Sequence, residues 1–229
     1  AHTTDERNTT MAPAFPYLPS GTVYGTLLNF RREHALWAPR MHEAPYKAPP
    51  RAPVLYIKTA NTFTPSDRTI ALPAGVDEVE GSPALGLVAG EGGAVAGCAL
   101  FNDVSIPHES YYRPPIKYRC VDGFLGVGPR MQALAGLSAL AGWQLSLKID
   151  GAVRQTVALA DLLRDAATLW AEVNAFQSMR AGDVLMLGTD CLPDGTRPRV
   201  RAGDVVEVGV IGAHGFAPLV NTFVQEGRA

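Results

Sequence analysis

The alternation of apolar and polar residues predicts a chain built mainly from short strands. Apolar runs, or runs that alternate with a period of two, are typical of strands because successive side chains point to opposite faces. Such runs occupy residues 22–29, 54–57, 84–89, 94–101, 143–149, 184–187 and 205–211. The Asp150-Gly151 pair then predicts a tight turn after the fifth run.

One segment carries a helical period instead. Apolar residues recur at intervals of three and four, which places them on one face of a helix; they are Leu162, Leu163, Ala166, Leu169, Trp170, Val173 and Phe176. We therefore predict a helix over residues 160–178 that packs on a sheet. Asp161 would lie near its start, where a carboxylate complements the exposed N–H groups.

Glycine and proline divide the chain into short elements. The 23 glycines and 18 prolines favour a loop-rich β architecture, and the prolines of residues 44–53 exclude a helix there. The pentapeptide Arg-Ala-Gly-Asp-Val occurs at residues 180–184 and 201–205, which predicts two similar turns that each begin a strand. Because composition changes nowhere sharply, we predict one domain over residues 22–229, preceded by an extension and arm over residues 1–21.

Composition narrows the functional classes. Hydrophobic residues make up 47% of the chain and charged residues 18%, with a formal charge of -2. A near-neutral chain without a basic run is not expected to bind nucleic acid or an anionic membrane surface. The three cysteines form no CxxC pair, and neither a membrane-spanning run nor a signal core is visible. We expect a cytoplasmic protein.

The segment around Asp103 is the most informative for chemistry. An apolar run ends in Asn102-Asp103, and the next residues include His108, Glu109, Tyr111, Tyr112 and Arg113. On spacing alone, an Asx turn is the commoner explanation of such a pair. The functional alternative is a carboxylate at a strand end that binds a hard cation such as Mg²⁺.

At these residues the chain resembles a known family. The stretch ALFNDVSIPHESYYRPPIKYRCVDGFLGVGP is similar to the central signature of the fumarylacetoacetate hydrolase family. Agreement extends to GTLLNFRREH, APYKAPPRAPVLYIKTANTFT, IDGAVRQ, RAGDVLMLGTD and GFAPLVN, and so from about residue 22 to residue 224. Within the family, the decarboxylase/isomerase branch of 4-hydroxyphenylacetate catabolism is the most similar. The resemblance implies a mainly β (α+β) fold, a mixed β-sandwich roll with few helices.

The resemblance also implies a chemistry and a set of site residues. Members use Mg²⁺ or Mn²⁺ to chelate an α-keto or enol acid, and the cation stabilises the enolate that forms on decarboxylation or proton transfer. Transferred by position, Asp103 is the metal ligand and Lys58 and Arg119 are catalytic candidates that bind carboxylates. Asn29, Gly188 and Thr189 are candidates for substrate binding.

The most important departures from the family pattern concern the metal ligands. Ser82 and Ala84 occupy the positions of two glutamate ligands, so one carboxylate of three remains. Mg²⁺ needs several oxygen ligands in octahedral array, and the sequence therefore predicts weak binding of the ion. Glu78 and Glu80 form a displaced Glu-Val-Glu whose side chains would share one strand face, although solvated acids beside a turn are the commoner explanation.

Other departures concern proton transfer. The family's His and the following Glu are replaced by Glu33 and Leu36, and the Pro that follows Gly-Thr is replaced by Asp190. Within the resembling branch, enzymes consist of two related halves, of which one keeps the metal ligands and the other has lost them. The present chain resembles the second kind.

Three functions follow from the resemblance. The first is decarboxylation and isomerisation of an unsaturated oxo-tricarboxylate through an enolate, by this chain or by an enzyme of which it is a subunit. The second is a non-catalytic, metal-deficient partner of a metal-competent relative. The third is hydrolysis of a carbon–carbon bond in a diketo acid, against which the missing His/Glu pair weighs. The expected partners are an oxo-dicarboxylate or oxo-tricarboxylate and a second subunit, in a homodimer or a heterodimer with a related chain.

Overall fold

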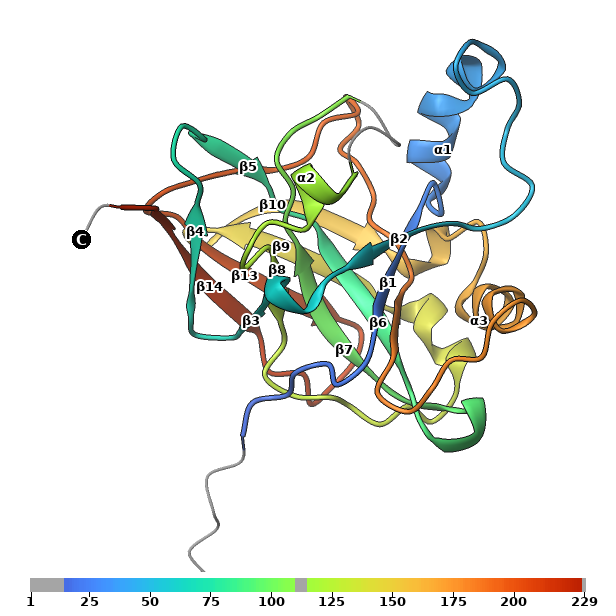
Figure 1. Cartoon of the computed structure of the whole chain (residues 1–229). Coiled ribbons are helices and arrows are strands. Elements are labelled where there is room, and N and C mark those ends of the chain that lie inside the picture. The colour runs from blue at the N-terminus through green and yellow to red at the C-terminus, as the bar shows by residue number, and fades with distance from the viewer. Residues whose placement is uncertain (1–14, 110–114, 228–229) are drawn as a thin grey trace, which may run out of the picture.

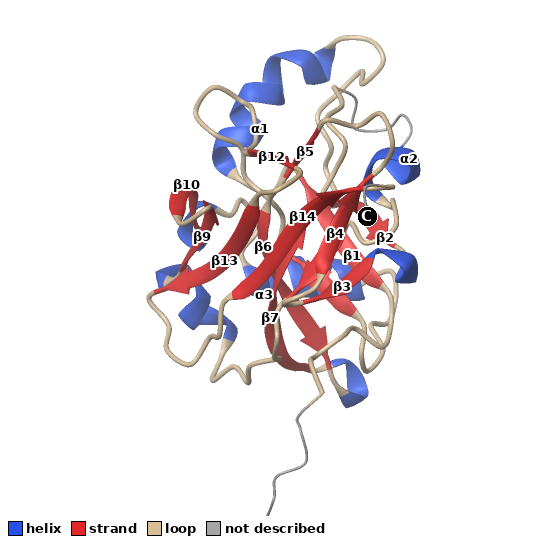
Figure 2. Ribbon diagram, turned by 90° about the vertical axis from the view of Figure 1, so that its left-hand side faces the viewer, coloured by secondary structure: helices blue, strands red, loops and turns tan. Residues whose placement is uncertain are grey.

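The computed structural model describes residues 15–109 and 115–227, and within them two large sheets lie against each other (Figures 1 and 2). The first sheet has seven strands in the order β2-β1-β11-β6-β7-β8-β3, and the second has five in the order β10-β9-β13-β14-β4. Strands β12 and β5 form a separate pair. The predicted mainly β fold with mixed sheets and few helices is confirmed.

The strands are short, as the glycine and proline content predicts. Their bounds are β1 Val23–Leu27, β2 Val54–Lys58, β3 Phe63–Pro65, β4 Thr69–Leu72, β5 Glu78–Glu80, β6 Pro83–Ala89, β7 Val95–Asp103, β8 Leu125–Val127, β9 Gln144–Ile149, β10 Ala152–Ala158, β11 Val184–Met186, β12 Arg199–Arg201, β13 Val205–Ile211 and β14 Leu219–Gln225. All seven predicted runs are confirmed as strands, while β3, β4, β5, β8, β10, β12 and β14 are additional.

The main core lies between the two sheets. Alternate residues of β6, Leu85, Leu87 and Ala89, face this layer, together with Leu145 and Leu147 of β9. Each of these side chains is almost fully buried. Because burial of an apolar side chain contributes about 1.5–3 kcal/mol, this layer is the principal source of the stability of the fold.

A second core lies on the opposite face of the seven-stranded sheet. All residues of β6 are buried, so this strand is covered on both faces. The second core takes side chains from six of the seven strands, with Phe63 of β3 packed against it, as expected for a sheet that curls around its own interior. Space there is limited: a Cβ at Gly25 would overlap the ring of Tyr56, and one at Gly86 would overlap Phe101.

The helices are few and short. They are α1 Arg31–Trp37, α2 Pro115–Arg119 and α3 Ala166–Asn174, with 3₁₀ turns η1 Ala38–His42, η2 Ala60–Thr62, η3 Glu91–Gly93, η4 Leu137–Gly142 and η5 Leu159–Asp161. In Figure 1, α1, α2 and β5 lie near the same end of the molecule, and α3 lies apart from them.

The helix predicted over residues 160–178 is wrong at both ends. Leu162 forms a bridge with Phe30, and the N–H groups of Leu163 and Arg164 donate to Asn29. Because these groups bond to another segment, the helix begins only after Asp165, whose side chain caps Thr168 N at 2.8 Å. The apolar period therefore extends beyond the helix that it indicates.

The turn predictions are confirmed. Asp150 and Gly151 both have positive φ, 50° and 81°, between β9 and β10, which suits a tight hairpin. In the two repeats, Asp183 Oδ2 accepts from Arg180 N and Asp204 Oδ2 accepts from Arg201 N, each at 2.8 Å. The repeated pentapeptide is therefore repeated turn chemistry.

A search of the helices in residues 15–109 and 115–227 found none with the length and apolar character needed to cross a membrane.

Candidate functional site

A cavity of about 320 Å³ opens at the end of the molecule where α1, α2, β5 and β12 approach one another. Among the described residues, its lining has an excess of basic over acidic side chains. The basic ones are Arg40, Arg119, Arg197 and Arg199, the acidic ones are Glu80, Glu109 and Asp194, and His108 lines the cavity as well. Such a lining attracts anions.

Beneath this cavity lies a buried cluster of ionisable side chains. Alternate residues of β2, Tyr56 and Lys58, point to the end of β7, where Asp103 is the last residue. Lys58 Nζ lies 2.9 Å from Asp103 Oδ1, and the Tyr56 hydroxyl donates to Asp103 Oδ2. Lys58 also donates to the carbonyls of Val104, at 3.0 Å, and Arg119. The structure thus brings the predicted residues Lys58 and Asp103 into direct contact.

Arg119 connects the cluster to the cavity. Its guanidinium carbon lies 4.6 Å from the centre of the Tyr56 ring, and its Nη1 lies 3.8 Å from Asp103 Oδ2. The side chain remains 10% exposed and lines the cavity. A guanidinium held by a ring face and a carboxylate presents a fixed positive charge to the cavity.

Electrostatics favour the ionised form of Asp103, whereas burial lowers the pKa of Lys58 in spite of the neighbouring Asp103 charge. Burial alone would raise the pKa of Asp103, but the charges of Lys58 and Arg119 and the hydrogen bonds from Tyr56 and Lys58 together lower it below its usual value. Burial and the Asp103 charge raise the pKa of Tyr56 well above its usual value. Asp103 is therefore an ionised carboxylate that accepts a hydrogen bond from the protonated hydroxyl of Tyr56.

The surroundings of Asp103 do not match a divalent-cation site. Both carboxylate oxygens face a positive or hydrogen-donating group, so a metal would have to displace Lys58 or Tyr56. Ser82 is buried, with its N–H donating to Asn102 Oδ1 at 3.0 Å, and Ala84 belongs to the second core. Within the described residues, no group of three or more His, Cys, Asp or Glu side chains is arranged to hold an ion.

Asn102 and Asp103 also depart from the predicted Asx turn. Both residues belong to β7, and their side chains reach β2 and the residue before β6. Their oxygens accept hydrogen bonds from residues distant in sequence, so the turn interpretation is wrong. Tyr111, Tyr112 and Arg113 of the same segment lie outside the described residues.

Glu78 and Glu80 share one face of β5, as predicted, and pair with arginines of β12. Arg201 Nη2 lies 3.2 Å from Glu78 Oε2, and Arg199 Nη2 lies 3.5 Å from Glu80 Oε1. Val79 between them is fully buried. These acids belong to an interstrand charge ladder, which offers a divalent ion no preformed set of oxygens.

Glu33 and Thr189 both contact Arg197, a residue that the sequence analysis did not identify. Arg197 Nη2 donates to Glu33 Oε1 at 2.6 Å and to Thr189 Oγ1 at 3.1 Å. Glu33, 2% exposed, replaces the family's His with a buried ion pair, whereas Leu36, at the position of the family's Glu, is 47% exposed. Arg197 follows Thr189 by eight residues across a loop, so no local pattern predicts the contact.

Asn29 and Gly188 hold the segments around the site. Asn29 Nδ2 donates to the carbonyls of Leu187 and Arg164, at 2.8 and 3.1 Å, and its Oδ1 accepts from Arg164 N at 3.0 Å. Gly188 has φ 126°, and a Cβ there would lie 3.2 Å from the carbonyl oxygen of Thr26. The amide of Asn29 is thus occupied by backbone groups, and its role in binding a substrate stays a prediction.

Tyr56 and Arg199 are the other side chains that the sequence reasoning missed. Tyr56 precedes Lys58 by two residues on the same strand, so the period of two could have placed it beside Lys58. Arg199 could not be identified in this way, because its position depends on the pairing of β12 with β5, which brings together residues about 120 positions apart.

Comparison with known proteins identifies relatives that are enzymes of aromatic catabolism. The family described as fumarylacetoacetate (FAA) hydrolase C-terminal matches residues 22–224. The 4-hydroxyphenylacetate degradation bifunctional isomerase/decarboxylase of Escherichia coli is 35% identical over 216 residues, which are 90% of this chain and 48% of that protein. The chain thus spans about half the length of the curated relative.

Solved structures share the fold. A 5-carboxymethyl-2-hydroxymuconate delta-isomerase from Mycobacterium smegmatis superposes with a TM-score of 0.71 at 23% identity, covering 93% of this chain and 82% of that one. A maleylpyruvate hydrolase from a Sphingobium species gives a TM-score of 0.67 at 18% identity, covering 90% and 71%. With the family match extending over most of its length, the chain belongs to the fumarylacetoacetate hydrolase family.

Proposed function

We propose that the chain binds an unsaturated oxo-dicarboxylate or oxo-tricarboxylate in the arginine-lined cavity and takes part in isomerase/decarboxylase chemistry without a divalent ion of its own. The observation that carries this proposal is the buried Lys58–Asp103–Arg119 cluster, which places a guanidinium in the cavity wall. The similarity of the chain to the bifunctional isomerase/decarboxylase supports the choice of substrate class.

The proposed chemistry replaces the metal with fixed protein charge. Decarboxylation or proton loss next to a keto group leaves an enolate, whose oxygen must be stabilised by a nearby positive charge. Arg119, held on the Tyr56 ring, supplies that charge without having to reorient. Arg197 and Arg199 pair with Glu33 and Glu80, and because both also line the cavity, their guanidinium groups can attract the remote carboxylates of a substrate.

A binding experiment tests the anion site. Titration calorimetry with 2-oxoadipate should show about tenfold weaker binding for Arg199→Gln, which removes a cavity charge and a charge-assisted hydrogen bond of about 1.5 kcal/mol. Arg201→Gln is the matched control, because Arg201 lies two residues further on the same strand, pairs with Glu78 and does not line the cavity. Equal affinity in the wild type and both variants would contradict the site.

A metal titration tests the absence of a resident ion. Wild-type protein titrated with Mn²⁺ should give no more heat than the Asp103→Asn variant, since Lys58 occupies the carboxylate. Turnover of the oxo-tricarboxylate should be equal with and without a chelator. Stoichiometric, Asp103-dependent binding of Mn²⁺ would overturn the metal-free part of the proposal.

The second candidate is a partner subunit that supports a metal-competent relative. It is favoured by the contact of Asp103 with Lys58, which leaves the carboxylate poorly placed to bind a metal, and by the chain's match to about half the length of the bifunctional relative. Turnover measured with the chain alone, and again after addition of a relative that keeps the three acidic ligands, separates the two candidates. Activity that appears only in the mixture, and is then abolished by a chelator, would support the partner role.

A further inference from the structure

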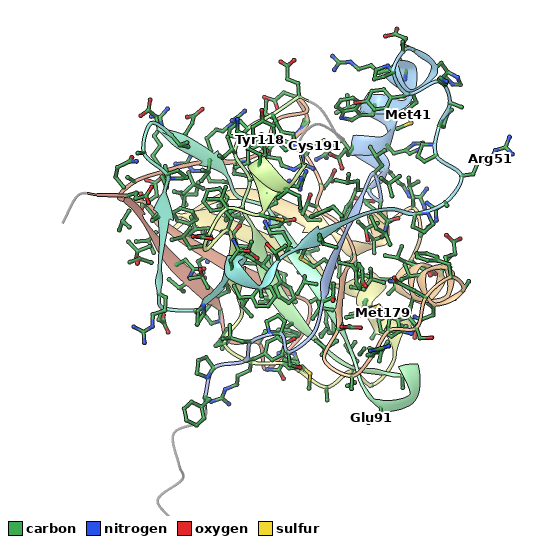
Figure 3. All side chains as sticks on the ribbon, viewed as in Figure 1. Met41, Arg51, Glu91, Tyr118, Met179 and Cys191 are labelled. Carbon is green, nitrogen blue, oxygen red and sulfur yellow. The ribbon has the colours of Figure 1, made fainter. Side chains whose placement is uncertain are left out.

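His108 occupies a fixed position in the cavity wall. Its ring stacks on Tyr118 with centroids 4.7 Å apart and planes 13° apart. Tyr118 lies in α2, one residue before Arg119, and is labelled in Figure 3. The backbone of this segment is anchored as well, since Ile106 N donates to the carbonyl of Tyr118 at 2.9 Å. The imidazole therefore has one orientation relative to Arg119.

The hydrogen bonds of His108 decide which ring nitrogen carries the proton. Nδ1 lies 2.8 Å from the carbonyl oxygen of Ile106, which can only accept. Nδ1 must therefore carry a hydrogen, and a neutral ring then has its lone pair on Nε2. Within the described residues, the hydrogen-bond contacts of the ring, with Ile106 O at 2.8 Å and with Ser105 Oγ at 3.4 Å, both involve Nδ1, and the side chain lines the same cavity as Arg119. This arrangement suits a proton acceptor.

Burial, together with two neighbouring arginines, favours the neutral form of the ring. Burial lowers the pKa of His108, and Arg119 of α2 and Arg197 of the loop before β12 lower it further. The hydrogen bond to Ile106 and the charge of Glu80 on β5 act in the opposite direction without reversing the shift. His108 is therefore a neutral base at neutral pH, and it loses that capacity as the pH falls through its lowered pKa.

We propose that Nε2 of His108 is the group that transfers protons in this cavity, in place of the His/Glu pair that Glu33 and Leu36 have replaced. The inference deepens the proposed function and rests on it. It concerns the isomerisation step, in which a carbon–carbon double bond moves relative to a keto group.

The step is balanced within the substrate and His108. Nε2 takes a proton from the carbon next to the conjugated keto system, and the electron pair of that C–H bond passes through the conjugated bonds to the keto oxygen. The products are an enolate, opposite the positive charge of Arg119, and a doubly protonated imidazole. Return of the proton to the other end of the conjugated system shifts the double bond and restores neutral His108.

The His108→Asn variant separates proton transfer from structure. The amide nitrogen of Asn can replace Nδ1 as the donor to Ile106, whereas nothing replaces Nε2. The matched control is His214→Asn, because His214 is an exposed histidine outside the cavity lining. Binding of 2-oxoadipate is measured by calorimetry, and exchange of the protons next to its keto group is followed by NMR in D₂O from pH 5 to 8.

We expect His108→Asn to bind 2-oxoadipate within about threefold of the wild type and to exchange its protons about 100-fold more slowly, the lower end of typical general-base contributions. The wild-type rate should fall toward acidic pH, and the variant should lack that dependence. Wild-type rates in His108→Asn, or an unchanged pH profile, would overturn the inference. If the wild type binds 2-oxoadipate but does not exchange its protons, the inference is overturned while the anion site stands. If the wild type does not bind 2-oxoadipate at all, the proposed function is refuted, and the inference with it.

Discussion

Two sets of ion pairs each contribute an arginine, Arg119 or Arg199, to the lining of the same cavity, and they differ chiefly in burial. In the cluster below the cavity, the side chains of Lys58 and Asp103 are 0% and 1% exposed. In the ladder between β5 and β12, Arg201 is 72% exposed and Glu78 is 36% exposed. The distances are similar, 2.9 and 3.2 Å, so geometry alone does not distinguish the pairs.

Removing one partner should nevertheless have very different consequences in the two sets. Exposed pairs contribute about 0–1 kcal/mol because water and salt screen them. A buried pair adds little net stability over an apolar replacement, yet removing one partner leaves a charge without compensation. A single substitution in the cluster should therefore destabilise the protein strongly, whereas a single substitution in the ladder should change the free energy of unfolding little.

The sharpest way to test this contrast is to remove one buried partner. Asp103→Ala leaves Lys58 buried without its counter-ion and should reduce the free energy of unfolding by about 3–5 kcal/mol. Urea unfolding followed by tryptophan fluorescence measures the change. The double variant Lys58→Met plus Asp103→Leu removes both charges and should recover most of the loss. A loss below about 1 kcal/mol for Asp103→Ala would place this pair in the same class as the ladder.

The second test perturbs the packing of the cluster without removing a charged side chain. In Gly25→Ala, the added methyl group overlaps the Tyr56 ring, which supports Arg119 and donates to Asp103. Overpacking of this kind costs about 1–3 kcal/mol, and weaker binding of 2-oxoadipate should accompany it. The control is Gly142→Ala, because nothing lies within 4 Å of a Cβ at that position. Equal melting temperatures for the two variants would contradict the prediction.

The smallest effect is expected in the ladder. Glu78→Gln should change the free energy of unfolding by less than about 1 kcal/mol, and the difference should disappear in 1 M salt, where the Debye length is about 3 Å. Urea unfolding at low and high salt measures it. A change of several kcal/mol that persists in salt would show that this exposed pair behaves like the buried one.

Much of the architecture was predictable because local patterns determine it. The runs that became β1, β6, β7 and β13 carry their own periodicity, and the turn at Asp150-Gly151 depends on adjacent residues. Helix α3 shows the limit of such reasoning. Its start is set by hydrogen bonds from Leu163 and Arg164 to Asn29, more than 130 residues away, which no local window contains.

The candidate site was predictable in part for the same reason. Lys58, Asp103 and Arg119 were identified through the family resemblance, and the structure brings them together. The sequence did not indicate that Lys58 would neutralise Asp103, because that contact depends on the approach of β2 to the end of β7. Arg197 was missed because its partners, Glu33 and Thr189, meet it only in the folded chain.

The order of the strands has a consequence for how the chain reaches its native state. Strand β1 pairs in parallel with β11, joining Val23 to Val184, and β4 pairs in parallel with β14, joining Thr69 to Thr222. Pairings of such long sequence separation form slowly, because the loops between them must close first. During synthesis, β1 and β4 should lack these partners until β11 and β14 have emerged from the ribosome, a state that favours chaperone binding.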